Sequence, residues 1–384
     1  MSPETDARIV VDRKLRESGW TLEGPNKNVL TEQHSKAGRA DYLLLDRSGK
    51  NLAIIETKND PYAAKEQARG YAQAKSCRYV FLANSEKLYF WDLSKGNAHL
   101  VEKFISPQDL QRRTDLTTLQ KPLTQIPHNK EIADRHYHLK ASDTVAHEFD
   151  TSDKRAFLLE MATGTGKTRL AAALIDRFLA AHQAERVLFI VDRITLAKQT
   201  IGVFQQMFKD KYGTAYYKPN QHGKWGGATI VVATIQSLNI HYKEDFTPGY
   251  FDLVFNDECH RSIYGELPRQ VIEYFQATRI GLTATPKDFL RNIDIEKLSD
   301  DNPKSLEIRM MRDTYKHFGC EVGTPTFRYS MQEAVKDKFL VPPKIYRGIS
   351  LVTSESLSEE GWNIEVDGDY SFLNNPPFTA YGGV

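Results

Sequence analysis

Residues 156–168 read AFLLEMATGTGKT, an apolar run that leads directly into two glycines, a lysine and a threonine. The run predicts a buried strand, and we expect a helix from Lys167 onward. At such a junction the glycines let backbone amides turn inward toward phosphate oxygens. The lysine adds a cation for the terminal phosphates, and the threonine hydroxyl is a ligand for Mg²⁺. We therefore predict a nucleotide-binding loop made of Thr163, Gly164, Thr165, Gly166, Lys167 and Thr168.

An acidic motif supports this interpretation. The stretch FDLVFNDECH places Asp257 and Glu258 at the end of another apolar run, 90 residues after Lys167. The aspartate can hold Mg²⁺, and the glutamate can orient the attacking water at the terminal phosphate. Two alternatives stay open: the acids could end a solvated turn, and the loop, which has Met161 where glycine or alanine is common, could only link a strand to a helix. Together the motifs predict a bound nucleoside triphosphate with Mg²⁺, and a catalytic role for Glu258.

Strands and helices alternate from His136 to about Leu290. The apolar runs are AFLLEMA, RVLFIVD, ATIVVAT, FDLVFND and RIGLTAT. Near-continuous apolar strands separated by helices predict a doubly wound parallel sheet, covered by helices on both faces. Ligands of such sheets lie at the carboxyl ends of the strands, which is where both motifs fall.

The first hundred residues predict a separate α/β unit. Two helices are expected over DARIVVDRKLRESGW and AAKEQARGYAQAKS, and strands over ADYLLLD, NLAIIETK, YVFLAN and KLYFWDL. Asp41 begins the first of these strands, and Glu56 and Lys58 end the second. Alternation places Glu56 and Lys58 on one face, and Asp41 can join them if the strands pair. Two carboxylates can then bind Mg²⁺ while the lysine positions the nucleophile for phosphodiester cleavage; a solvated strand edge is the alternative.

Composition adds little on partners. The 51 basic and 50 acidic side chains nearly cancel, so net charge does not indicate a nucleic acid. The three cysteines are far apart and Cys259 and His260 have no partners at ligand spacing, so neither disulfides nor zinc are predicted. No apolar run approaches the roughly 20 residues of a membrane span, and we expect a cytoplasmic protein. The expected segments are a nuclease domain at 1–106, a linker at 107–134 with room for a short helix, an ATP-binding lobe at 135–290, and a connector with the truncated start of a second lobe at 291–384.

Four stretches resemble motifs of superfamily-two helicases and translocases: VLFIVDRITLAKQ, VVATIQSL, DECH and GLTATP. The resemblance implies a RecA-like lobe that binds ATP, in which Thr283 and Thr285 couple the nucleotide state to lobe movement. Many such helicases carry Arg-x-Tyr-Gln ahead of the loop, with an adenine-reading glutamine; this chain has RHYH at 135–138, with His138 in that place. A helix start capped by Thr234 is an alternative to one of the implied DNA contacts. The residues that the resemblance places along a nucleic-acid track are Arg193, Thr234, Gln236 and Ser237.

The N-terminal pattern resembles the RecB-like branch of the PD-(D/E)xK nucleases, because E-x-K is followed by a helix with Gln67 and Tyr71 in Q-x-x-x-Y spacing. In that branch the glutamine and tyrosine support the active site or touch DNA. An acid from the first helix is often added, and Glu4 and Asp12 are both candidates. Such a nuclease ahead of a lobe with DECHRSIY and IGLTATP resembles the R subunit of type I restriction enzymes, over about residues 1–347. The resemblance implies translocation on double-stranded DNA, cleavage, and assembly with methylation (M) and specificity (S) subunits.

Three other interpretations stay open. The chain could be a stand-alone helicase whose N-terminal domain only binds DNA, or an inert piece that assembles with partner subunits. It could also be a type III restriction subunit, although there the nuclease normally follows the motor.

One expectation concerns the chain by itself. Helicase motors hydrolyse ATP between two lobes, and the second lobe supplies arginines that stabilise transition-state charge. Those later motifs do not occur in these 384 residues. We therefore expect the purified chain to bind ATP-Mg²⁺ weakly and to turn over slowly, and robust DNA-stimulated ATP hydrolysis would contradict this.

Overall fold

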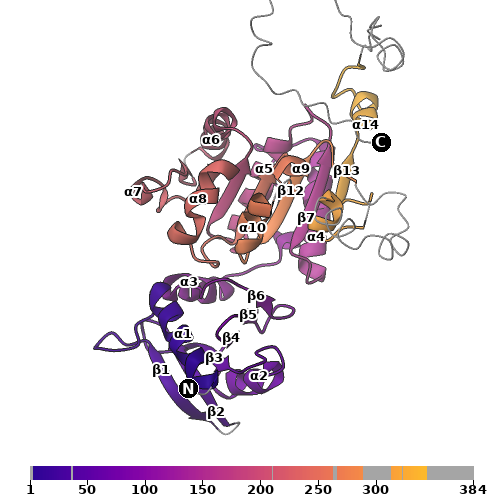
Figure 1. Cartoon of the computed structure of the whole chain (residues 1–384). Helices are drawn as coiled ribbons and strands as arrows, with labels where there is room; N and C mark the ends of the chain where they lie inside the picture. Colours follow the sequence, from indigo (N-terminus) through magenta and orange to yellow (C-terminus); the bar gives the residue numbers. More distant parts are fainter. Residues whose placement is uncertain are drawn as a thin grey trace, which may run out of the picture. The chain divides into compact units, whose positions relative to one another are not determined.

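The computed structural model describes residues 3–35, 38–209, 211–262, 266–288, 313–321 and 323–343. The chain divides into two compact units, Met1–Leu340 and Val341–Val384, and both sheets lie in the first unit. This unit contains a mixed sheet in its N-terminal part and a parallel sheet after it (Figure 1). No helix among the described residues has the length and apolar character needed to cross a lipid bilayer.

The N-terminal domain is built on a six-stranded sheet. Its strands, in spatial order, are β1 (Val29–Ser35), β2 (Gly38–Leu45), β3 (Asn51–Thr57), β4 (Tyr79–Ala83), β5 (Leu88–Asp92) and β6 (His99–Leu100). Strands β3 and β4 pair in parallel and are joined through α2 (Lys65–Ala74), whereas the other neighbours are antiparallel. Helices α1 (Pro3–Glu17) and α3 (Pro107–Thr117) pack on one face, and α2 packs on the other.

The four strands and two helices expected in this domain are confirmed. Strands β1 and β6 were not predicted, because VLTEQHS and HL are polar or too short to show a pattern. The placement of Asp41 at the start of its strand is corrected: β2 begins at Gly38, so Asp41 lies inside it. The short helix that the 107–134 segment had room for is α3, and Leu110 joins the domain core.

The second sheet has seven strands, and all of its pairings are parallel. Their spatial order is β13 (Phe327–Tyr329), β7 (Ala156–Met161), β12 (Thr278–Thr283), β11 (Leu253–Asp257), β8 (Val187–Val191), β10 (Ile230–Thr234) and β9 (Thr214–Tyr216). One face carries α4 (His136–Thr151), α5 (Lys167–Ala180) and α6 (Ile194–Phe208). The other carries α8 (Ile235–Asp245), α9 (Cys259–Ser262), α10 (Glu266–Tyr274) and α13 (Thr314–His317). The remaining short helices are η1 (Leu123–Gln125), α7 (His222–Trp225) and α14 (Met331–Lys336).

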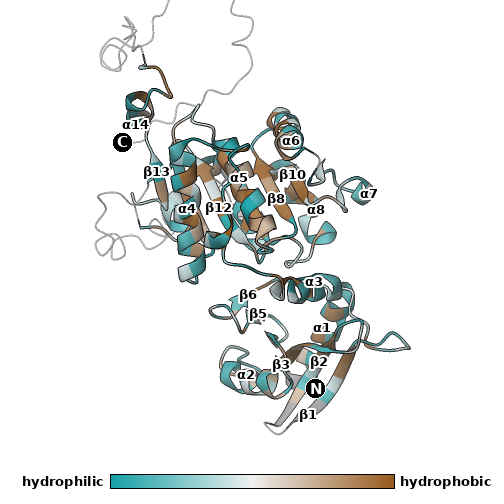
Figure 2. Ribbon diagram, turned by 180° about the vertical axis from the view of Figure 1, so that it is seen from behind, coloured by the Kyte–Doolittle hydropathy of each residue, from teal (hydrophilic) through white to brown (hydrophobic). Residues whose placement is uncertain are grey.

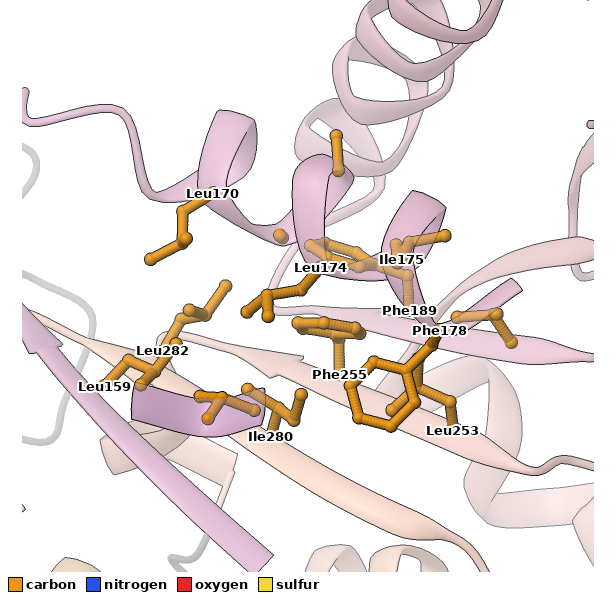
Figure 3. Packing of buried hydrophobic residues seen from close by; sticks show 14 of the residues in the cluster. Leu159, Leu170, Leu174, Ile175, Phe178, Phe189, Leu253, Phe255, Ile280 and Leu282 are labelled. Carbon is orange, nitrogen blue, oxygen red and sulfur yellow. The ribbon is translucent and has the colours of Figure 1, made fainter. Parts of the chain in front are cut away.

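Alternation along the strands explains why helices cover both faces. Phe255 points into the cluster that holds α5, while its neighbour Val254 points into the cluster that holds α8 and α10. Figure 2 shows the central strands β8 and β10 as hydrophobic, as expected for strands buried on both sides. Figure 3 shows Leu174 and Phe178 of α5 packed against side chains of the strands. The predicted α/β fold with a doubly wound parallel sheet is confirmed.

The assignment of 291–384 to a connector and the start of a second lobe needs correction. Strand β13 pairs with β7, with Phe327 opposite Leu159 and Tyr329 opposite Met161, so this part of the segment belongs to the first lobe. A three-residue edge strand carries no periodicity, and its partner is more than 160 residues away along the chain. Residues 289–312 and 344–384 of the segment lie outside the described residues.

Candidate active sites

The predicted nucleotide loop joins the end of β7 to the start of α5. Gly164 and Gly166 have φ angles of +85° and +88°, a region that residues with a Cβ rarely adopt. A Cβ on Gly166 would also lie 3.1 Å from the ring of His138. The buried Thr165 donates its hydroxyl to the carbonyl of Ala162 at 2.6 Å. The loop therefore has a tight backbone at a helix start, the conformation that directs amides toward an oxyanion.

The acidic motif faces the lysine of this loop. Lys167 Nζ lies 3.4 Å from Glu258 Oε1, and Asp257 is the last residue of β11. Burial, and next the neighbouring Glu258 carboxylate, raise the pKa of Asp257 to about 6. A carboxyl whose ionisation is disfavoured in this way would be stabilised by a divalent cation, so the residue set fits Mg²⁺ beside Thr168. Glu258 adopts φ of +50°, which is uncommon for a residue with a Cβ and which aims its side chain at Lys167.

His260 connects the acidic motif to the end of β12. Its Nδ1 lies 2.9 Å from Thr283 Oγ1, and its Nε2 lies 3.4 Å from Thr285 Oγ1. Nδ1 is also 3.5 Å from Glu258 Oε2. Burial lowers the pKa of His260, so the ring links these groups as a neutral hydrogen-bonding side chain near pH 7. From the sequence, His260 was considered only as a possible zinc ligand, although its position two residues after Glu258 was a signal for this role.

Two residues of α4 contact the backbone of the nucleotide loop. The Tyr137 hydroxyl donates to the Thr165 carbonyl at 2.7 Å, and His138 Nε2 lies 2.9 Å from the same oxygen. A carbonyl only accepts, so His138 carries its proton on Nε2. Burial lowers the pKa of His138 to about 4, and its Nδ1 has no hydrogen-bond partner among the described residues. Tyr329 of β13 stacks on Tyr137 with 4.0 Å between ring centroids, which joins the edge strand to the loop.

The four residues implied along a nucleic-acid track divide into two kinds. Arg193 and Gln236 are exposed, and Arg193 Nε lies 3.5 Å from Asp192 Oδ2. Thr234 is buried, and its Oγ1 accepts from the Ser237 amide at 3.2 Å. The Ser237 hydroxyl donates back to the Thr234 carbonyl at 2.8 Å. The structure thus has the helix cap that was the alternative for Thr234, and its hydroxyl is committed to that cap.

In the N-terminal domain, Asp41 and Glu56 come from adjacent antiparallel strands. Tyr42 is opposite Ile55, and continuing that register by one residue places Asp41 opposite Glu56. Both carboxylates are buried. Lys58 follows the last residue of β3, and its Nζ lies 3.5 Å from Glu56 Oε1. The structure therefore brings these three predicted side chains together.

The two carboxyls differ in their electrostatic surroundings. Burial, and next the Asp41 carboxylate, raise the pKa of Glu56 to about 7. Burial also opposes the ionisation of Asp41, but hydrogen bonds from Thr57 and Arg8 outweigh it and lower the pKa of Asp41. Thr57 donates its amide and its hydroxyl to Asp41 Oδ2 at 2.8 and 2.7 Å. Asp41 is therefore ionised at neutral pH, while Glu56 is poised between its two forms.

The first helix supplies a cation to this site. Arg8 Nη2 lies 2.7 Å from Asp41 Oδ1, and Nη1 lies 3.1 Å from Glu32 Oε1. The guanidinium lies between two carboxylates, where a positive charge is favourable. No local sequence signal indicated that Arg8 would be part of this site. Of the two acids considered for the first helix, Asp12 instead accepts from the Tyr42 hydroxyl at 2.9 Å. The side chain of Glu4 lies outside the described residues.

Gln67 and Tyr71 interact with each other on α2. Gln67 Nε2 lies 2.6 Å from the Tyr71 hydroxyl, and Tyr71 is buried in the cluster between α2 and the sheet. No hydrogen bond among the described side chains links this pair to Asp41, Glu56 or Lys58. Helix α2 packs on the face of the sheet that carries Glu56, because Ile54, two residues before Glu56 in the strand, belongs to the same cluster.

The residues of the N-terminal site fit a metal ion in one specific respect. Glu56 Oε2 is buried and has no hydrogen-bond partner among the described residues, which is costly for a carboxylate unless a cation binds it. In the described part of the chain, no three His, Cys, Asp or Glu side chains are grouped closely enough to form a metal site by themselves. Backbone carbonyls and water would therefore have to complete the coordination of Mg²⁺ around Asp41 and Glu56.

Several known proteins are similar to this chain. Residues 131–288 match the family model described as type III restriction enzyme, res subunit. The type I restriction enzyme EcoAI endonuclease subunit of Escherichia coli is 31% identical over 332 residues, covering 80% of this chain and 37% of that protein. The EcoKI endonuclease subunit of Escherichia coli strain K12 is 29% identical over 213 residues, covering 49% of this chain and 16% of that protein. A fragment structure assigned to an HsdR subunit of a type I restriction enzyme from Vibrio vulnificus YJ016 overlaps 88% of this chain and 61% of its own, with 27% identity and a TM-score of 0.38.

The chain thus spans about a third or less of the length of these two curated relatives. The sequence match with the EcoAI subunit extends over four fifths of the chain, well beyond the segment of the family model. These matches confirm the resemblance predicted from the sequence: the chain is a relative of the endonuclease subunits of type I restriction enzymes, and its residues 131–288 match a restriction-enzyme subunit family.

Proposed function

We propose that this chain is part of the R subunit of a type I restriction endonuclease, in which ATP-dependent translocation of double-stranded DNA is coupled to Mg²⁺-dependent phosphodiester cleavage. One observation carries the proposal. Two separate groups of carboxylates, each with a lysine beside it, lie at two different sheets of the same chain; the first group is buried and the second is half-buried. In both groups burial raises a carboxyl pKa, as expected where a cation and a phosphate normally bind.

In the helicase lobe, different residues would bind the phosphates, hold Mg²⁺ and orient the attacking water. The loop from Thr163 to Thr168 would hold the phosphates by its amides. Lys167 would break its ion pair with Glu258 and contact the terminal phosphate instead. Asp257 and Thr168 would hold Mg²⁺, which neutralises charge on the phosphates when bound. Glu258, released from Lys167, would orient the attacking water. His260 would transmit the change at Glu258 to Thr283 and Thr285 through its two ring nitrogens.

In the N-terminal domain, the proposed reaction is hydrolysis of the DNA backbone. Asp41 and Glu56 would bind Mg²⁺, which supplies a water of lowered pKa and charge stabilisation for the leaving oxygen. Lys58 is half exposed at the edge of this site, so its ammonium can reach both the nucleophile and a phosphate oxygen. Arg8 would have to leave Asp41 Oδ1, and its guanidinium would then be free to meet the incoming phosphate. DNA, the M and S subunits and a cytoplasmic location belong to the same proposal.

Lys58→Ala tests the nuclease part. The variant should reduce Mg²⁺-dependent nicking of plasmid DNA by at least about 100-fold, because the ammonium that positions the nucleophile is removed. The measurement is plasmid cleavage by the chain extended to the full R subunit and assembled with M and S, with and without ATP. The matched control is Lys87→Ala, an exposed lysine in the same domain. If Lys58→Ala cleaves as fast as Lys87→Ala, the domain is a DNA-binding module and the nuclease assignment fails.

A further inference from the structure

A cavity of about 370 Å³ lies at the opposite end of the parallel sheet from the nucleotide loop. Its lining includes Arg155, which directly precedes β7, and Thr278 and Arg279 at the start of β12. Lys95, from the segment between β5 and β6, lines it from the N-terminal domain. Because parallel strands begin at this edge and end at the other, the cavity is separate from the ATP site.

Three cations converge on this cavity. The amide of Arg279 donates to the carbonyl of Arg155 at 2.7 Å, so the two residues are held side by side. Burial lowers the pKa of Lys95 to about 8, and Arg155 is among the cations that lower it further. Burial also lowers the pKa of Arg279 and of Arg155. In each case burial outweighs the nearby acids, among them Asp92 for Lys95, Asp150 and Asp153 for Arg155, and Glu273 for Arg279.

The acids that line the cavity already have other partners. Asp92 accepts from Arg78 at 2.9 and 2.6 Å, and Asp252 is paired with Arg112. Glu273 is about half exposed and lies 3.9 Å from Arg269, and it offsets only part of the effect of burial on the pKa of Arg279. Among the described residues neither Lys95 nor Arg279 has a carboxylate within ion-pair distance.

Arg155 is only partly satisfied. Its Nη1 donates to backbone carbonyls, among them that of Lys154 at 2.7 Å, while its buried Nε has no hydrogen-bond partner among the described residues. Cations buried without partners cost free energy, and a bound anion would remove that cost.

We propose that this cavity binds a small phosphate-bearing molecule, whose phosphate group is held by Lys95, Arg155 and Arg279. Guanidinium groups match the geometry of phosphate oxygens, and a lysine adds a third donor. The cavity has the volume of a small-molecule site and is larger than one phosphate. Apolar side chains in its lining, Phe90, Phe149 and Phe275, leave room for an attached organic group. The site is independent of the nuclease and ATPase assignments.

The test uses the Lys167→Ala chain, in which the phosphate site of the nucleotide loop is weakened. Inorganic phosphate is titrated by calorimetry at constant ionic strength, balanced with sodium chloride. We expect saturable binding, and a rise of at least about 2 °C in the melting temperature at saturating phosphate. Lys95→Gln and Arg279→Gln should each weaken phosphate binding by at least about tenfold. The matched controls Lys87→Gln and Arg47→Gln, at exposed positions, should leave it unchanged.

The melting temperature measured without phosphate distinguishes a phosphate-binding role of Arg279 from a role in stabilising the fold. Arg279→Gln removes a half-buried charge that no carboxylate among the described residues pairs with, so its melting temperature in chloride should equal or exceed that of the parent. A loss of stability in chloride together with an undiminished phosphate response would overturn the proposal. So would a phosphate response that chloride reproduces, or one that is equal in Lys95→Gln and in the parent. Lys95→Gln, at a partly exposed site, keeps the test valid if Arg279→Gln does not fold.

Two further ligands identify the source of the phosphate. Adenosine monophosphate that binds more tightly than phosphate, and competes with it, supports a phosphorylated small molecule. A short DNA duplex that binds at Lys95 and Arg279 while neither small ligand does so would overturn the proposal in favour of a backbone contact.

Discussion

Glu56→Gln should reduce Mg²⁺-dependent DNA cleavage by at least about 10³-fold and at the same time make the metal-free chain more stable at pH 8. The loss of cleavage follows from the loss of a carboxylate ligand. The gain in stability follows from the buried carboxylate, whose Oε2 has no partner among the described residues. If Glu56 served only to stabilise the fold, Glu56→Gln would make the metal-free chain less stable at pH 8.

The direction of the stability change follows from the pKa values. Burial and Asp41 raise the pKa of Glu56 from 4.5 to about 7, so between these values the folded chain keeps a proton that the unfolded chain has lost. Stability therefore falls as pH rises through this window and stays lower above it, by about 3 kcal/mol. Glutamine does not ionise and avoids this loss. At pH 4 the two proteins should have similar stability.

Cleavage is measured on plasmid DNA with the assembled R subunit, and stability by urea unfolding of the chain in EDTA at pH 8 and pH 4. Glu86→Gln, an exposed carboxyl in the same domain, is the matched control and should change neither property. If Glu56→Gln destabilises the chain at pH 8, or if it cleaves like Glu86→Gln, the assignment of Glu56 as a metal ligand is wrong.

Lys167→Ala and Glu258→Gln should separate ATP binding from ATP hydrolysis. Lys167→Ala removes the cation for the terminal phosphates and should weaken ATP-Mg²⁺ binding by about 100-fold. Glu258→Gln should keep binding, because the loop and Lys167 remain and the ion pair at 3.4 Å no longer holds the lysine. Its hydrolysis should fall by about 10² to 10⁴, the usual contribution of a group that activates water.

Binding is measured by titration with a fluorescent ATP analogue, and hydrolysis under single-turnover conditions with duplex DNA, so that slow turnover does not hide the effect. Lys224→Ala and Glu185→Gln change exposed residues of the same lobe and serve as controls. Should Glu258→Gln lose binding to the same extent as Lys167→Ala, Glu258 is a structural partner of the lysine and has no role in activating water.

The parallel sheet was largely predictable because its signals are local. Each of the five predicted strands is a largely buried and mainly apolar run, and the glycines, lysine and threonine of the loop come soon after β7. The strands that were missed, β9 and β13, have three residues each and lie at the two edges of the sheet, and the partner of β13 is more than 160 residues away along the chain. Edge strands of this length carry no periodicity by which they could be recognised.

The sequence alone determined the chemistry available at each site. Asp41, Glu56 and Lys58 could be proposed together because a strand alternates with a period of two, and Lys167 and Asp257 because they follow apolar strands. The tertiary structure alone decided which groups meet. It placed Arg8 on Asp41, left Glu56 Oε2 without a partner, and put His260 between Glu258 and Thr283. The physical reason is that secondary structure depends on neighbours along the chain, whereas the pKa of a buried group and its hydrogen bonds depend on residues that only folding brings within a few ångströms.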